Sequence, residues 1–275
     1  MTEPLVRRVF AALLAIGAAA ACSKDAARGN STKSSAVKTI KTKDSAAGSV
    51  DLGGTTYKAM PLTATGSIAG TIQLDGGPRI DSVAVTNDQP FCGKWLGGAV
   101  IASAQGLSNS VVWIADMKSG KALPVARRGD LASEDCGVDP RVQASVVGTT
   151  FNVTNDDKLL HRLIFTEMGT SDTLTVMPFF NSGQVVASER LAKHSGIVEV
   201  RCAIHPWTHA YIAVFDHPYF AVTGKDGSFK IDSLPPGSYK MMVWHEGAAQ
   251  PLERQVQVAA NGEAKVDVSI KIAGP

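Results

Sequence analysis

The sequence predicts an all-β protein that contains two β-sandwiches. From residue 66 onward, short segments of alternating apolar and polar residues follow one another, separated by turn-forming residues. The 275 residues include 26 Gly and 13 Pro, while 44% of the residues are hydrophobic, enough for a sizeable core. Only residues 187–193 have a weak helical pattern. Many short strands at this spacing are typical of sandwiches.

The N-terminus, residues 1–22, is predicted to be a signal peptide. Arg7 and Arg8 precede an apolar run over residues 9–21 that is too short to span a bilayer, and small residues lead into Cys22. The segment resembles a bacterial lipoprotein signal, in which Cys22 is the acylated first residue of the mature chain. The arginine pair also fits a loose twin-arginine pattern. We therefore expect a lipoprotein of the cell envelope, anchored on the periplasmic side of a membrane.

Residues 23–65 are predicted to be a flexible tether. Residues 23–50 are rich in Ser, Ala, Thr and Lys and have almost no large apolar side chains. Such a segment cannot bury enough surface to offset the entropy lost on ordering. After the N-terminus no apolar stretch approaches transmembrane length, and a net charge of only +2 gives no reason to expect nucleic acid as a partner.

The globular body begins with a strand in which Ile68, Gly70, Ile72 and Leu74 alternate before the turn at residues 75–78. Residues 109–114 indicate a buried strand. Further strands are predicted over residues 149–154, 161–167, 196–202, 211–215, 219–223, 228–231, 238–244, 255–258 and 265–272. Hairpin and turn signals at residues 224–227, 234–237 and 261–262 connect the last of them.

The run Cys202-Ala203-Ile204-His205-Pro206-Trp207 contains a candidate metal-binding pair. Val198, Val200 and Cys202 share one face of the preceding strand, so the thiol points into a hydrophobic interior while His205 closes over it from the loop. His161 lies upstream, where another alternating segment begins. Two His and one Cys form the ligand set that holds copper for electron transfer. The alternative interpretation is a buried free Cys beside a surface His.

Two stretches, residues 155–165 and 200–207, resemble the cupredoxins. In that family the first His follows a loop of the form Asn-x-Asp-x-x-x-His, which Asn155, Asp157 and His161 match. The other ligands lie on one loop between the last two strands, as Cys202 and His205 do. The resemblance implies one mononuclear, type-1-like copper site at His161, Cys202 and His205 that acts in electron transfer.

The resemblance does not identify a fourth ligand, because Thr208 is found where the family usually has Met as a weak axial ligand. His209 follows immediately, at a spacing where other cupredoxins place the axial Met. One alternative is that His209 is the fourth ligand. The other is that the protein supplies no fourth ligand beyond a backbone carbonyl and that His209 points to solvent. An imidazole would pull the site toward tetragonal geometry and a lower potential. A second departure is Arg162, where Asn often follows the first His, and the usual hydrogen bonding around the metal is then changed.

The C-terminal part of the chain, together with its first strand, resembles a carboxypeptidase-regulatory-like or transthyretin-like sandwich. The matching stretches are residues 66–72, 223–229 and 234–239. The combination is similar to bacterial periplasmic proteins that join a plastocyanin-like domain to such a sandwich, a likeness that continues through residues 216–223 to 243–247. We expect a cupredoxin-like Greek-key domain, residues 140–216, inserted after a connection at 119–139 between the two parts of the sandwich, 66–118 and 217–275. The alternative layout places residues 66–139 in a separate unit.

These resemblances assign two of the four cysteines, Cys22 to lipid and Cys202 to metal. The remaining pair, Cys92 and Cys136, is expected to form a disulfide in an oxidising cell envelope. The alternative is that all three thiols after Cys22 are unpaired.

The first functional hypothesis is an electron carrier that docks on a redox protein partner in the cell envelope. An apolar patch at Pro206 and Trp207 would surround the ring edge of His205, where a small transient interface could form. The alternatives are copper sensing, storage or delivery, a non-metal binding or scaffolding module with a degenerate site, and a copper enzyme. We do not expect an enzyme, because the sequence contains no phosphate-binding loop, no nucleophile elbow and no His-Glu-x-x-His motif.

The other polar candidates are expected to be structural. The adjacent acids Asp156 and Asp157 are predicted to form a turn and to orient His161. His217 and His245 lie beside aromatic residues, where structural hydrogen bonding is a simpler role than a second metal site. His194 lies in a polar stretch and has no specific predicted role.

Overall fold

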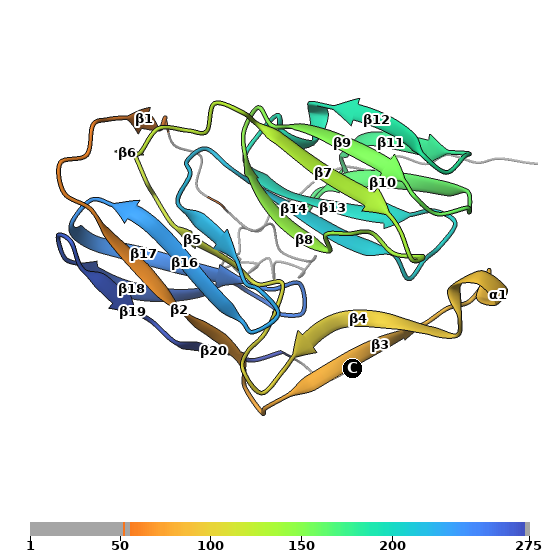
Figure 1. Ribbon diagram of the computed structural model, residues 1–275, viewed down its shortest axis with the longest axis horizontal. Helices are drawn as coiled ribbons and strands as arrows, with labels where there is room; N and C mark the ends of the chain where they lie inside the picture. The colour runs from red at the N-terminus through yellow and green to blue at the C-terminus, as the bar shows by residue number, and fades with distance from the viewer. Residues whose placement is uncertain (1–51, 53–55, 273–275) are drawn as a thin grey trace, which may run out of the picture. The chain divides into compact units, whose positions relative to one another are not determined.

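The computed structural model describes residue 52 and residues 56–272, and it confirms the all-β prediction (Figure 1). Among the described residues the only helical elements are α1 (Gln89–Cys92) and a 3-10 turn, η1 (Arg190–Ala192), at the position of the weak helical pattern. None of the helices in this part of the chain is long and apolar enough to span a membrane. The predicted signal peptide, the lipidated Cys22 and most of the tether lie outside the described residues.

One pair of sheets takes its strands from both ends of the described chain. The first sheet has the order β15 (Phe220–Val222), β5 (Val111–Ile114), β17 (Gly237–Trp244) and β18 (Leu252–Val258). In the second, β2 (Gly66–Leu74) lies between β16 (Ser228–Leu234) and β19 (Glu263–Lys265), and β20 (Val268–Ile270) also pairs with β2. Alternate residues of both sheets are buried in one core, which includes Ile68, Ile72, Ile114, Ile231, Met241, Val243 and Val258.

A second pair of sheets is built from the middle of the chain. Its larger sheet has the order β11 (Thr173–Phe179), β10 (His161–Glu167), β13 (Gly196–Cys202), β14 (His209–Phe215) and β8 (Val142–Val146). Its smaller sheet has the order β12 (Gln184–Ser188), β9 (Thr150–Asn155) and β7 (Arg128–Ser133). The two share a core that includes Leu131, Phe151, Val153, Leu163, Phe165, Val200, Ile212 and Val214.

The structure contains strands that were not predicted, among them β8, β11 and β12, and it differs from the predicted boundaries in the connection and in the tether. The region 119–139, predicted as a connection, contains β7, whose six residues pair in parallel with β9 from Arg128 opposite Thr150 onward. The end of the predicted tether contains β1 (Lys58–Ala59), which pairs in parallel with β6 (Ser119–Gly120). In addition, the hydroxyl of Tyr57 donates a hydrogen bond to the backbone oxygen of Lys121 at 2.6 Å. Both segments pair with distant parts of the chain that local composition does not reveal.

Strands β3 (Arg79–Ala84) and β4 (Trp95–Ala102) form a long antiparallel hairpin that leads away from β2 and β20 and carries α1 at its tip (Figure 1). We call residues 79–102 the arm. The predicted disulfide is present: Cys92 in α1 is bonded to Cys136, with a Cα–Cα distance of 5.6 Å. The tip also packs through Val85 against Trp207. The arm therefore joins the two pairs of sheets covalently.

Candidate metal centre

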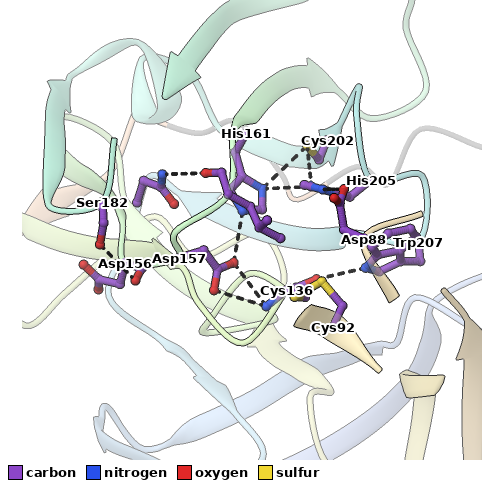
Figure 2. Close-up of polar contacts among 12 residues, drawn as sticks. Asp88, Cys92, Cys136, Asp156, Asp157, His161, Ser182, Cys202, His205 and Trp207 are labelled. Atoms are coloured by element: carbon purple, nitrogen blue, oxygen red, sulfur yellow. Dashed lines mark hydrogen bonds and ion pairs between the residues drawn. A yellow bond between two sulfur atoms is a disulfide. The ribbon is translucent and has the colours of Figure 1, made fainter. Parts of the chain in front are cut away.

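The three predicted metal ligands lie together at one end of the second pair of sheets (Figure 2). The Sγ atom of Cys202 is 3.8 Å from Nδ1 of His161 and 3.6 Å from Nδ1 of His205, and the two Nδ1 atoms are 3.2 Å apart. All three residues are buried, none being more than 4% exposed. The structure thus brings together residues that are 41 and 44 positions apart in the sequence.

The register of β10 and β13 explains this arrangement. Leu163 lies opposite Cys202 in the antiparallel pair, so His161, two residues earlier on β10, is at the same end and faces the same side. His161, Leu163 and Phe165 alternate as the buried residues of β10. His205 is placed by the loop after β13, in which the Ala203 amide donates to the Arg162 oxygen at 2.9 Å and the Thr208 amide donates to the His205 oxygen at 3.0 Å. The pairing of β10 and β13 thus determines the positions of His161 and Cys202, and the short loop after β13 determines that of His205.

The spacing of the three ligand atoms fits a metal ion. A point equidistant from the two Nδ1 atoms and Sγ lies about 2.1 Å from each, close to the about 2.0–2.3 Å of bonds from zinc to His nitrogen and Cys sulfur. Two imidazoles and one thiolate around such a point form the trigonal donor set of copper electron-transfer sites.

Each ligand histidine also faces a carboxylate with its outer ring nitrogen. Nε2 of His161 is 3.0 Å from Oδ2 of Asp157, and Nε2 of His205 is 3.2 Å from Oδ2 of Asp88 (Figure 2). Asp157 is itself buried, and its Oδ2 also accepts the Cys136 amide at 3.1 Å. A carboxylate at Nε2 favours the tautomer that carries its proton there, which leaves the Nδ1 lone pair free for a metal.

The predicted role of Asp157 in orienting His161 is therefore confirmed. Asp156 contributes through its backbone, since its amide donates to Ser133 and its oxygen accepts from the Ser182 hydroxyl. Asp88 was missed by the sequence analysis. It lies 117 residues from His205, at the tip of the arm, and no local motif marks it.

The electrostatic surroundings favour a neutral His161. Burial, followed by the nearby His205, holds the pKa of the His161 imidazole below its usual range. Metal binding requires an imidazole without its second proton, so this shift prepares His161 as a ligand near neutral pH.

His209 does not join the cluster. On β14 it lies opposite Arg201, whose side chain projects from the face of the sheet opposite to that of Cys202. Its Nδ1 is 3.8 Å from Oε1 of Glu199, and hydrogen bonding to His209 is the largest of the interactions that lower the pKa of Glu199 to about 2. Of the alternatives for a fourth ligand, the one in which His209 is the axial ligand is therefore not supported. Thr208, at the family's Met position, is buried, and its hydroxyl has no hydrogen-bond partner among the described residues.

The predicted docking patch is only half present. Pro206 is exposed, but Trp207 is 5% exposed, and its Nε1 donates to the Cys136 oxygen at 2.9 Å. The centroid of its ring lies 5.1 Å from that of His205. The prediction of an exposed Trp207 is thus wrong, because the tip of the arm and the disulfide cover this ring.

The remaining histidines have structural surroundings. His217 and His245 are buried, and the Nδ1 atom of each accepts a backbone amide two residues further on, from Tyr219 at 3.2 Å and from Gly247 at 3.0 Å. His194 is exposed. In the described part of the chain the only cluster of three or more potential metal ligands is that of His161, Cys202 and His205.

Comparisons with known proteins agree with parts of this picture. A family model described as polysaccharide lyase family 4, domain II, matches residues 208–266. No curated protein matches the sequence. The carboxypeptidase-regulatory-like resemblance stays a prediction.

Solved structures with similar folds include cupredoxins. A purple cupredoxin from Nitrosopumilus maritimus has 19% identity over 31% of this chain and 98% of its own, with a TM-score of 0.26. Amicyanin from Paracoccus versutus has 16% identity over 33% of this chain and 84% of its own, with a TM-score of 0.28. The Cu-containing nitrite reductase from Thermus scotoductus SA-01 has 20% identity over 38% of this chain, with a TM-score of 0.29, and only 24% of its own length is matched. At these TM-scores the likeness carries no argument about function, which depends on the site itself.

Proposed function

We propose that this protein binds one copper ion at His161, Cys202 and His205 and carries electrons in the cell envelope. The observation that carries the proposal is the buried triangle of two Nδ1 atoms and one Sγ atom, with both outer ring nitrogens facing carboxylates. When bound in a His2Cys set, copper supplies one-electron chemistry between its two oxidation states.

The donor set favours copper over zinc. A structural zinc site has four protein ligands, but among the described residues the cluster contains three. A catalytic zinc site keeps an open position for water. Here all three ligand residues are at most 4% exposed, which leaves little room for an exchanging ligand.

The surrounding residues hold the ligands in place. His161 and Cys202 are fixed on paired strands, and Asp157 and Asp88 hold the two imidazole rings. Ligands that barely move between oxidation states keep reorganisation small, which suits electron transfer. Their burial disfavours rapid hand-over of the metal, as delivery would require. Export to the cell envelope is supported by the Cys92–Cys136 disulfide, since such bonds persist in oxidising compartments.

A Cu(II) titration followed by visible absorption and electron paramagnetic resonance tests the proposal. We expect a strong thiolate-to-copper band that saturates at one equivalent, and a reversible one-electron couple in voltammetry. Cys202→Ser should abolish the band. His209→Ala is the matched control, because it removes a neighbouring imidazole outside the cluster and should leave the band unchanged. No stoichiometric binding by protein whose Cys202 is a reduced thiol would overturn the proposal.

A further inference from the structure

One of the two carboxylates at the metal centre comes from the arm, a two-stranded sheet of its own that belongs to neither pair of sheets. His205 lies on the loop between β13 and β14, whereas Asp88, which faces its Nε2 atom, lies at the tip of the arm. The arm continues directly from β2, which belongs to the first pair of sheets. Of the two carboxylates at the centre, one is therefore local and the other is delivered from a distant part of the fold.

Several contacts hold Asp88 in this position. Asn87 donates through Nδ2 to Oδ2 of Asp88 at 2.9 Å and also to the Ile204 oxygen at 3.3 Å, in the ligand loop itself. Four residues after Asp88, the Cys92–Cys136 disulfide ties the tip to the region before β8. The tip is thus fixed both to the ligand loop and to the second pair of sheets.

The backbone at Asp88 is also specialised. Its φ of 51° and ψ of 25° lie in the left-handed region at the start of α1. Among residues with a side chain, Asp and Asn adopt this conformation most readily. The conformation turns the chain into α1 while the side chain reaches His205. Position 88 thus combines an unusual backbone with a direct contact to a metal ligand.

Asp88 covers the ring edge that would otherwise face solvent. His205 is 1% exposed, while the side chain of Asp88 is 41% exposed, so the carboxylate lies between the imidazole and water. Asp157, by contrast, is buried and shares its oxygen with a backbone amide. Of the two carboxylates at the centre, the one on the arm is therefore the one in contact with solvent.

We propose that Asp88 is a positioning residue of the metal centre, which holds His205 with Nδ1 toward the metal and strengthens its donation. This inference rests on the proposed copper function. A carboxylate that accepts the Nε2 proton fixes the tautomer and ring orientation of a ligand histidine and raises its basicity. A more basic imidazole stabilises the oxidised metal more than the reduced metal, because the higher charge gains more from the added electron density.

Two substitutions separate charge from hydrogen bonding at position 88. Asp88→Asn keeps an acceptor but removes the negative charge, and Asp88→Gly removes the side chain. Both residues tolerate the left-handed backbone, so neither adds strain there. Asp156→Asn is the matched control, since it removes one exposed charge beside Asp157 without touching a ligand ring.

The measurements are the midpoint potential and the Cu(II) affinity of each copper-loaded full-length variant. Loss of such a partner typically costs about 10–100-fold in metal affinity. A tenfold loss confined to Cu(II) raises the midpoint potential by about 59 mV. We expect the potential to rise from wild type to Asp88→Asn to Asp88→Gly, with Asp156→Asn close to wild type. Potentials and affinities of both Asp88 variants that equal those of wild type would overturn the proposal.

A second measurement is independent of copper. In metal-free protein, nitrogen NMR of the imidazole rings should find His205 protonated at Nε2 in wild type and in a mixture of tautomers in Asp88→Gly. An unchanged tautomer in Asp88→Gly would overturn the proposal. A wild-type protein without a copper band overturns the proposed function instead, and the tautomer measurement then still decides the role of Asp88.

Discussion

Acid should destabilise the protein through His217 and His245, which are not part of the metal centre. Both side chains are buried, and each Nδ1 atom accepts a backbone amide, which requires an unprotonated nitrogen. Burial lowers the pKa of each imidazole to about 4. For His245 the neighbouring Arg141 adds to this shift.

The direction follows from proton linkage. Unfolded, each histidine regains a pKa of about 6.5, so between that value and about 4 the unfolded chain binds more protons than the folded one. The free energy of unfolding therefore falls as the pH is lowered through this range. Above the unfolded pKa of about 6.5 this loss does not occur. Between pH 7 and pH 5 each histidine should cost the folded state about 2 kcal/mol.

Urea unfolding of metal-free protein at pH 7 and pH 5, followed by tryptophan fluorescence, measures this loss. His161 also has a lowered pKa, so wild type alone does not isolate the two histidines. His245→Gln and His217→Gln remove one titrating group each, and each should reduce the loss between the two pH values by about 2 kcal/mol. The reasoning is refuted if the variants lose as much stability on acidification as wild type does.

Three further predictions concern the contacts that hold the metal centre and the two pairs of sheets together. Glu246→Gln breaks a buried two-bond ion pair with Arg141, with N–O distances of 2.5 and 2.8 Å, and should lower the free energy of unfolding by about 3 kcal/mol in urea titrations. Replacing Cys92 and Cys136 by Ser opens a loop with a sequence separation of 44 and should lower the free energy of unfolding by about 4 kcal/mol. Bound copper should then be lost faster to a chelator, and an unchanged rate of loss would show that the arm does not close the site. Asn155→Ala removes two hydrogen bonds to the backbone oxygens of Leu159 and Asn181, at 3.0 and 3.2 Å, and should lower the free energy of unfolding by about 2 kcal/mol and weaken copper binding. An unchanged copper affinity would show that these bonds are not needed to position the loop before His161.

The fold class could be predicted from local alternation, and the three candidate ligands from the Cys-x-x-His spacing together with the resemblance to cupredoxins. Alternation along the strands places Cys202 and His161 on buried faces. Only two residues separate Cys202 from His205, so His205 can lie on the same side as the thiol. The disulfide was expected because the resemblances assigned Cys22 and Cys202 to other roles and left Cys92 and Cys136. None of these inferences needed to know which distant segments pair.

The misplaced residues depend on tertiary structure. His209 has the spacing of a loop ligand, but β14 begins at that residue, and pairing with Arg201 turns its side chain to the other face. Trp207 follows an exposed Pro206 in a loop, yet the tip of the arm covers it.

The arm itself escaped prediction because most of its residues show no buried face. Only the end of β4, with Val100 and Ala102, reaches the core of the first pair of sheets. The residues of β3 alternate between partly buried and exposed, and Ile80 is among the most exposed large apolar side chains of the described chain. A strand without a buried stripe, such as β3, gives no strong strand signal, and in β4 the buried residues are small or follow two glycines, Gly97 and Gly98. Val100 and Ala102 pack the base of the arm into the first core, and residues far away in sequence hold its tip.

If the centre carries electrons as proposed, the arm affects how a redox partner could reach it. In a site whose loop histidine is exposed to solvent, a redox partner can contact the edge of that ring directly. Here His205 is buried under Asp88, so a partner that approaches from this side meets the tip of the arm first. The Asp88 carboxylate in contact with the imidazole is partly exposed, which favours a partner with positive charge at its own contact surface. The same residue that is proposed to tune the centre therefore lies on the path by which electrons would enter or leave it.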